Sequence, residues 1–215
     1  MKHRPVIQSW TRRQFLQAAA GAVVAPNIVT SSTLGANGRA SANERIGVGL
    51  IGAGERGQYV LSAFMAQRDT QVLAVCDVIR YRREEARNLV NQGYGHRDCS
   101  AYIDMLELLE RSDIDVVAIA TGDNWHSGVS ILAARAGKDI YCEKPMSVTI
   151  AESRAVADTM RRLGRIFQCG TQRRSLGNFR FAVDLARSGK LGRLTELHAE
   201  EASAFREIHE TTLPA

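Results

Sequence analysis

Residues 46–57 constrain the fold of this chain more than any other segment, because a short apolar strand runs there directly into a glycine-rich turn. Their sequence is IGVGLIGAGERG, which contains the spacing G-x-G-x-x-G. Gly52 permits a tight turn, Gly54 lets the backbone approach a pyrophosphate, and Gly57 lets the next helix pack closely on the strand. The first-turn amides of that helix would face the anion. The segment therefore predicts the start of a dinucleotide-binding βαβ unit.

An acidic residue after the second predicted strand supports the same interpretation. Residues 71–76 are QVLAVC, and Asp77 follows them at the place where a carboxylate meets the adenosine ribose hydroxyls. That carboxylate would repel a 2′-phosphate, so the sequence favours NAD over NADP, a preference that Arg80 or Arg82 nearby would weaken. The cofactor contacts expected from the turn and this acid are Gly52, Ala53, Gly54, Glu55, Arg56, Gly57 and Asp77.

Strand and helix patterns alternate through the rest of residues 43–170. Further strands are predicted at 114–120, 139–142 and 165–170. Helices are predicted at 58–68, 80–92, 102–111, 125–136 and 149–163, the last opened by a capping box of Thr149 and Glu152. Charged residues 82–87 are interpreted as a solvated face of their helix. This alternation predicts an α/β fold with a doubly wound parallel sheet, that is, a Rossmann NAD(P)-binding domain.

The pattern changes after residue 170. A linking helix is predicted at 174–188, and residues 194–202 alternate as a strand with one exposed face. One strand cannot bury its own apolar face, so either the chain is a fragment or this strand pairs with something else. We therefore assign 171–215 to the start of an incomplete α+β second domain, which would bind substrate and form oligomer contacts.

The first 42 residues read as a leader outside the fold. Residues 11–17 are TRRQFLQ, and the apolar run 15–24 that begins there is too short for a stable membrane anchor. The segment resembles a twin-arginine export signal, with Gln17 in place of the usual lysine; the alternative is a basic amphipathic helix. Cleavage near residues 40–42, export by the twin-arginine machinery and a periplasmic location follow. Because an exported protein cannot draw freely on cytoplasmic NAD, the cofactor is expected to be tightly held and recycled within each turnover.

Charge and cysteine content exclude several classes of function. The chain has 28 basic and 23 acidic residues, and the excess of five lies in the leader. Without it the two signs balance, so no charge argument favours nucleic acid. The four cysteines show no C-x-x-C spacing and are interpreted as buried apolar residues. No metal site is predicted.

Four further segments carry a resemblance to a known family. Residues 120–126 (ATGDNWH) and 136–145 (AGKDIYCEKP), with 170–174 (GTQRR) and 189–192 (GKLG), resemble the glucose–fructose oxidoreductase / inositol dehydrogenase (Gfo/Idh/MocA) family. The resemblance runs from about residue 46 to about residue 201. It implies an NAD(P)-dependent oxidoreductase acting on a sugar or cyclitol, with an antiparallel-sheet second domain that makes the full-length protein a homo-oligomer.

The resemblance also implies roles for individual residues. Lys144 would lie beside the nicotinamide and the substrate hydroxyl and act in catalysis, where its ammonium lowers the cost of charge on the hydroxyl. Glu143 would contact the nicotinamide ribose. The nicotinamide side of the cleft would be lined by Thr121, Asn124, Trp125 and His126, although a histidine in a first helical turn also suits packing. Gln172 and Arg173 would reach the substrate.

The chain departs from the family pattern in three places. Gly122 stands where many members have proline, and Asn124 stands where many exported members have histidine. The D-x-x-x-H arrangement of the family's second domain is absent from these residues. Two alternatives to a dehydrogenase therefore remain. One is an exported NAD-dependent glycosidase that uses transient oxidation and elimination, and the other is a truncated, non-catalytic cofactor-binding remnant.

Overall fold

The computed structural model describes residue 35, residues 40–196 and residue 198. Most of the predicted leader and most of the predicted strand 194–202 lie outside these residues. The chain divides into a unit that ends at Gly170 and a unit that begins at Thr171. This is also the position at which the sequence predicts the end of the Rossmann domain. Each unit is described by itself below.

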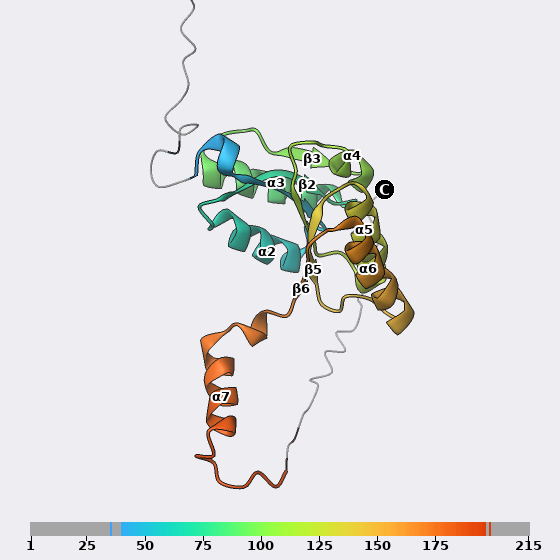
Figure 1. The fold of residues 1–215 in the computed structure, drawn as a ribbon. Coiled ribbons are helices and arrows are strands. Elements are labelled where there is room, and N and C mark those ends of the chain that lie inside the picture. The colour runs from blue at the N-terminus through green and yellow to red at the C-terminus, as the bar shows by residue number, and fades with distance from the viewer. Residues whose placement is uncertain (1–34, 36–39, 197, 199–215) are drawn as a thin grey trace, which may run out of the picture. The chain divides into compact units, whose positions relative to one another are not determined.

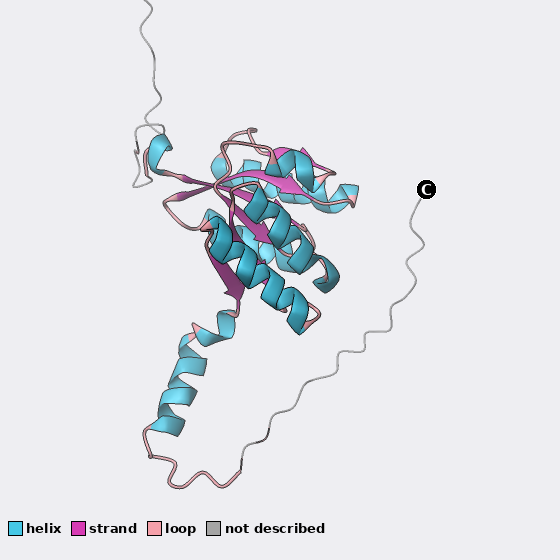
Figure 2. Ribbon diagram, turned by 45° about the vertical axis from the view of Figure 1, so that its right-hand side comes forward, coloured by secondary structure: helices cyan, strands magenta, loops and turns pink. Residues whose placement is uncertain are grey.

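The first unit is built on one six-stranded parallel sheet (Figures 1 and 2). The strand order is β3-β2-β1-β4-β5-β6, and every neighbouring pair is parallel. The strands are β1 (Ile46–Ile51), β2 (Thr70–Cys76), β3 (Ser100–Tyr102), β4 (Val116–Ile119), β5 (Asp139–Glu143) and β6 (Phe167–Gly170). Because the order reverses between β1 and β4, the connections leave a crevice at the carboxyl ends of these strands. The predicted doubly wound α/β class is confirmed.

Helices cover both faces of this sheet. They are α2 (Glu55–Met65), α3 (Arg80–Tyr94), α4 (Met105–Leu109), α5 (Asp123–Arg135) and α6 (Ile150–Leu163). Figure 1 shows α2 and α3 on one side and α4, α5 and α6 on the other. Two buried apolar clusters fill the layers: Val60 and Val90 of the first pair pack against Leu50, whereas Val129 and Val156 belong to the opposite cluster. Burial of this apolar surface is the main driving force for the arrangement.

Several predicted boundaries differ from the structure. The predicted helix 102–111 is a short strand, β3, followed by the one-turn-and-a-half helix α4, because Asp104 caps α4 by accepting a hydrogen bond from Leu106 N. Helix α3 continues through Gly93 and ends at Tyr94, where Gly95 forms the C-cap with φ 72°. The capping box of Thr149 and Glu152 is confirmed. Glycine caps end α3 and α6, at Gly95 and Gly164.

Arg83 corrects the interpretation of residues 82–87 as a solvated face. Arg83 is only 7% exposed, and its Nη1 donates to the carbonyl oxygen of Asp77 at 2.5 Å. Its neighbour Arg82 is half-buried. The buried guanidinium thus ties α3 to the end of β2, where the predicted cofactor site lies.

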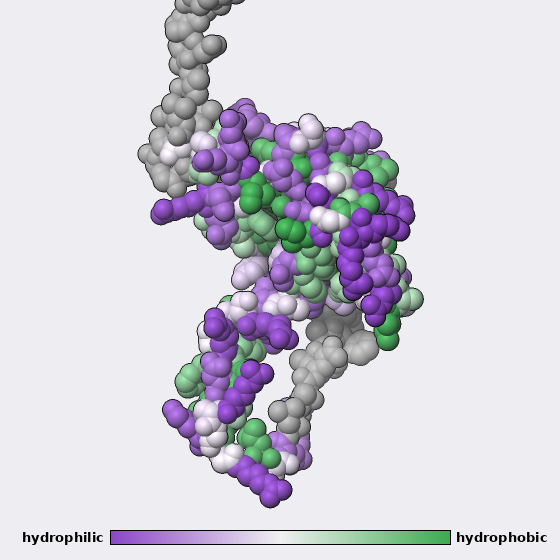
Figure 3. Space-filling model, viewed as in Figure 1, coloured by the Kyte–Doolittle hydropathy of each residue, from purple (hydrophilic) through white to green (hydrophobic). Residues whose placement is uncertain are grey.

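The second unit contains the 3₁₀ turn η3 (Gln172–Arg174) and helix α7 (Gly177–Arg187), in place of the single predicted helix 174–188. Hydrophobic and hydrophilic residues lie together over α7 in Figure 3, and Phe181 is among its exposed side chains. Residues 194–196 and 198 are not in a strand, and the rest of the predicted strand lies outside the described residues. Within the part of the chain that is described, no helix is long and apolar enough to span a bilayer.

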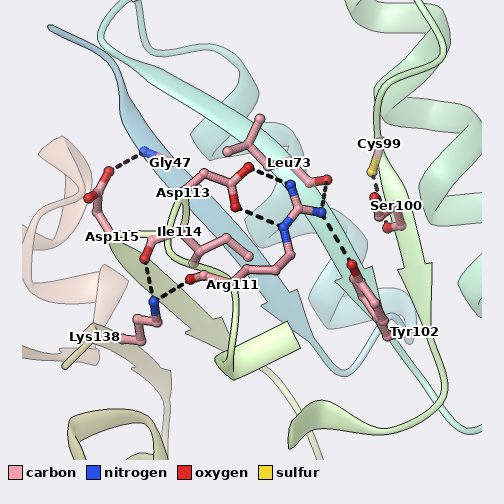
Figure 4. Close-up of polar contacts among 10 residues, drawn as sticks. All are labelled: Gly47, Leu73, Cys99, Ser100, Tyr102, Arg111, Asp113, Ile114, Asp115 and Lys138. Carbon is pink, nitrogen blue, oxygen red and sulfur yellow. Dashed lines mark hydrogen bonds and ion pairs between the residues drawn. The ribbon is translucent and has the colours of Figure 1, made fainter. Parts of the chain in front are cut away.

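A polar network lies at the amino ends of the strands, opposite the crevice (Figure 4). Lys138 is 6% exposed, and its Nζ donates to the carbonyl oxygens of Arg111 and Ile114. Desolvation lowers the pKa of Lys138, although the nearby carboxylates of Asp115 and Asp113 oppose the shift. Asp115 in turn accepts a hydrogen bond from Gly47 N at 2.7 Å. The network joins the starts of β1, β4 and β5.

We expect Lys138→Met to lower the free energy of unfolding by about 1–3 kcal/mol, because two buried carbonyl oxygens lose their donor. Urea denaturation measures the change. The matched control is Lys144→Met, which removes an exposed ammonium and should change the free energy by less than about 0.5 kcal/mol. Equal effects of the two substitutions would contradict a stabilising role for the network.

Candidate functional site

The turn between β1 and α2 brings its backbone segments into very close contact. A Cβ placed on Gly57 would lie 2.0 Å from the carbonyl oxygen of Gly52, and one on Gly52 would lie 2.6 Å from the carbonyl group of Ala120. Gly52 also adopts φ 91°. At Gly54, by contrast, a Cβ would meet only the guanidinium of Arg82, at 3.7 Å. The turn is therefore tightly packed at Gly52 and Gly57. It has open space at Gly54, where the glycine spacing predicts a phosphate.

Asp77 holds this turn in place. Its Oδ2 accepts a hydrogen bond from Ala53 N at 2.7 Å, and its Oδ1 accepts one from Ile79 N at 2.8 Å. The carbonyl oxygen of the preceding residue, Cys76, accepts a hydrogen bond from Gly52 N. The acid that the sequence assigns to the ribose thus also fixes the glycine turn, a role that the strand pattern did not reveal.

A cavity of about 760 Å³ opens at the carboxyl ends of β1, β2 and β4. Its lining includes six of the predicted cofactor residues, which are Gly52, Gly54, Glu55, Arg56, Asp77 and Thr121. Apolar side chains that follow β2 and β3, among them Val78, Ile79, Ile103 and Met105, form another part of the wall. The sequence analysis did not predict these residues. Their position within a few residues of a strand end was the feature that could have indicated them.

His126 lies inside the unit rather than on the cavity wall. It is 1% exposed, with Nδ1 2.6 Å from the carbonyl oxygen of Pro145 and Nε2 3.1 Å from that of Thr121. A direct cofactor contact, as predicted, does not fit this position, and the packing interpretation does. The ring connects the loop after β4 to the segment after β5, so it holds two parts of the site together.

The remaining predicted residues of the nicotinamide side lie in the first turn of α5. Trp125 is exposed and lines the cavity, together with Thr121. Asn124 is exposed but is not among the lining residues. Gln172 and Arg173 belong to the second unit, in η3. Their predicted substrate contacts stay predictions.

Glu143 is the last residue of β5 and Lys144 follows it, and the two side chains differ in exposure. Glu143 is buried, and its Oε1 accepts a hydrogen bond from Arg56 Nη2 at 2.7 Å; this bond raises the pKa of Arg56. Lys144 is exposed, and its backbone N donates to Glu143 Oε2 at 3.3 Å. The predicted catalytic lysine is thus presented to solvent at the same sheet edge as the glycine turn.

The buried cysteines are poor nucleophiles at neutral pH. All four are free thiols, and Cys76, Cys99 and Cys142 are buried. Burial raises the pKa of Cys76 to about 12 and that of Cys142 to about 12, so the thiolate form is scarce. Among the described residues, no group of His, Cys, Asp and Glu side chains is arranged to hold a metal ion.

Comparison with known proteins identifies related sequences. The family described as "Oxidoreductase family, NAD-binding Rossmann fold" (GFO_IDH_MocA) matches residues 46–171. The chain is 34% identical over 128 residues to a Glycosyl hydrolase family 109 protein from Saccharopolyspora erythraea, covering 58% of this chain and 28% of that protein. It is 28% identical over 160 residues to an inositol 2-dehydrogenase from Salmonella paratyphi B, covering 74% and 45%.

A solved structure shares the fold. The myo-inositol 2-dehydrogenase from Lactobacillus plantarum superposes with a TM-score of 0.62 at 23% identity, covering 70% of this chain and 43% of that chain. The chain therefore spans less than half the length of each of these three proteins. At 23% sequence identity, the similarity to this structure shows a shared fold and nothing more.

We expect His126→Ala to lower the free energy of unfolding by about 2 kcal/mol, because a buried ring and its hydrogen bond to a carbonyl oxygen are removed. Thermal or urea denaturation measures it. Asn124→Ala, an exposed position two residues earlier, serves as the control and should leave stability within about 0.5 kcal/mol. A His126→Ala protein as stable as the control would show that the ring does not join the two loops.

Proposed function

The chain belongs to the Gfo/Idh/MocA oxidoreductase family with an NAD-binding Rossmann fold, and on that premise we propose that it is the cofactor-binding part of a sugar or cyclitol oxidoreductase. One observation carries the proposal. The glycine turn, braced by Asp77, opens into a cavity of about 760 Å³ at the strand ends where doubly wound sheets bind their ligands. A dinucleotide is the class of ligand that this turn suits.

The residues present fit NAD. Gly54 leaves open space beside the backbone, and it provides no side-chain oxygen to cap α2, so the first-turn amides are left for an anion. Arg56 and Arg82 line the same cavity and add positive charge for the pyrophosphate. When bound, NAD supplies a hydride acceptor or donor. The protein supplies the cradle and the position of the groups around it.

Asp77 supports NAD as the preferred cofactor. Its carboxylate lies on the cavity wall, where a 2′-phosphate would meet a negative charge. Arg82 lines the same wall and would offset part of this repulsion. We therefore propose NAD first and NADP as the weaker ligand.

Lys144 is proposed as the catalytic group. Its Nζ would stabilise negative charge on the reacting hydroxyl and pass on the proton of that hydroxyl. The inositol 2-dehydrogenase relative supports a cyclitol or sugar hydroxyl as the substrate. Gln172 and Arg173 would contact this substrate.

A second candidate is an NAD-dependent glycosidase, and the name of the Saccharopolyspora relative favours it. In such a reaction a hydroxyl would be oxidised transiently, the neighbouring proton would become acidic, the aglycone would leave by elimination, water would add to the resulting double bond, and the carbonyl would be reduced again. The oxidoreductase instead leaves its sugar or cyclitol substrate oxidised or reduced. Glycoside cleavage without net nicotinamide reduction therefore separates the two functions.

We further propose that the protein is exported by the twin-arginine route and acts in the periplasm. The paired arginines before residues 15–24 support this proposal. A tightly held cofactor, recycled within each turnover, suits an enzyme that has no access to the cytoplasmic pool. The homo-oligomer expected of the full-length protein is likewise a proposal that rests on the family.

Cofactor titration tests the proposed function. We expect the wild-type chain to bind NADH at least about tenfold more tightly than NADPH, measured by nicotinamide fluorescence or calorimetry. Asp77→Asn removes the charge and one of the two oxygens that accept backbone hydrogen bonds, so it should weaken NADH and shift the preference toward NADPH. Asp98→Asn, at an exposed position outside this cavity, is the control and should change neither. Absence of NADH binding to the folded wild type would contradict the proposal.

A further inference from the structure

The buried carboxylate of Glu143 is surrounded on several sides. Its side chain is 4% exposed and accepts hydrogen bonds from Arg56 Nη2 at 2.7 Å, from Lys144 N at 3.3 Å and from the hydroxyl of Tyr141 at 3.4 Å. A Cβ on Gly170 would come within 3.0 Å of the carboxyl group. The cavity described above does not include Glu143 in its lining. Its position is therefore fixed by protein groups and lies behind the cavity wall.

Arg56, in contrast, reaches both the interior and the cavity. Its side chain is 43% exposed and lines the cavity, while its Nη2 bonds to Glu143. The guanidinium carbon also lies 4.7 Å from the centre of the Tyr59 ring. A guanidinium carries five N–H donors in a planar fork, so a bond to one carboxylate oxygen leaves donors for a phosphate. Arg56 is thus able to contact Glu143 and an anion in the cavity at once.

The pair also joins two parts of the site that are distant in sequence. Arg56 lies in the first turn of α2, directly after the glycine turn, and Glu143 ends β5, 87 residues later. Lys144, the proposed catalytic residue, follows Glu143 immediately. A contact between these two side chains therefore sets the glycine turn relative to the segment that carries the lysine.

We propose that Arg56 is a positioning residue that bridges Glu143 and the cofactor pyrophosphate, and that Glu143 acts on the cofactor through Arg56 rather than by touching the nicotinamide ribose. The inference rests on the proposed NAD site and specifies how that site is ordered. Burial of an unpaired carboxylate is costly, so Glu143 keeps the guanidinium in place before the cofactor arrives. An arginine that is already ordered loses less side-chain entropy when the phosphate binds.

A double-mutant cycle with NADH tests this bridge. Arg56→Gln should weaken NADH binding by about tenfold, as expected for the loss of a charge-assisted hydrogen bond to phosphate. Arg56→Lys should recover part of the loss, because it keeps the charge but not the fork. Glu143→Gln should weaken binding by about threefold when Arg56 is present, and it should have no effect in the Arg56→Gln background. The matched control is Arg82→Gln, which removes a second positive charge from the same cavity wall and should weaken NADH less than Arg56→Gln does.

Hydrogen exchange of the free chain provides a readout that does not depend on the cofactor. The amides of residues 55–58 should exchange faster in both Arg56→Gln and Glu143→Gln than in the wild type, whereas Arg82→Gln should leave them unchanged. Faster exchange at these amides supports the positioning role. Unchanged exchange in both variants overturns it.

Two results of the titration would also overturn the bridge. If Glu143→Gln weakens NADH equally with and without Arg56, Glu143 contacts the cofactor itself. If Arg56→Gln is no worse than Arg82→Gln, the position of Arg56 is irrelevant and only its charge matters. Both results leave the proposed function standing, because the wild type still binds NADH. A wild type that binds no NADH removes the proposed function, and the bridge is overturned with it.

Discussion

The close approach of backbone segments in the β1–α2 turn is the constraint on which the site depends. A side chain at Gly57 would overlap the carbonyl oxygen of Gly52, so only glycine lets α2 begin at this point against the sheet. That geometry leaves Gly54 open toward the cavity and places Arg56 within reach of β5. Asp77 stabilises the same turn, because its carboxylate accepts a hydrogen bond from Ala53 N. The glycine turn proposed to bind phosphate and the residues that hold it in place therefore depend on one another.

Much of this arrangement could be predicted from the sequence, because it depends on local rules. The glycine spacing, the acid after β2 and the capping box at Thr149 are each encoded within a few residues. What could not be predicted depends on tertiary contacts. Arg83 looks like one more charge on a solvated helix until its partner, the carbonyl oxygen of Asp77, is known. His126 likewise looks available to a cofactor until Pro145 and Thr121 are seen to occupy its ring nitrogens.

The site is divided between groups that face the cavity and groups that hold them. Gly54, Arg56 and Asp77 line the cavity, whereas His126 and Glu143 lie behind it and connect loops from different strands. The contacts of these buried side chains hold the loops in the geometry that hydride transfer requires. A misplacement of the reacting groups by about 1 Å lowers the reaction rate. The polar network around Lys138 performs a comparable structural role at the opposite edge of the sheet, away from the chemistry.

Amide chemical shifts measured during an NADH titration test most directly whether a dinucleotide binds across the glycine turn. The account predicts that the largest changes fall at residues 52–57, 77–79 and 121–122, with little change at the amino edge around Lys138. Changes of this kind would place the cofactor against α2 and the ends of β1, β2 and β4. Saturable shifts confined to another surface, or none at all, would contradict the account.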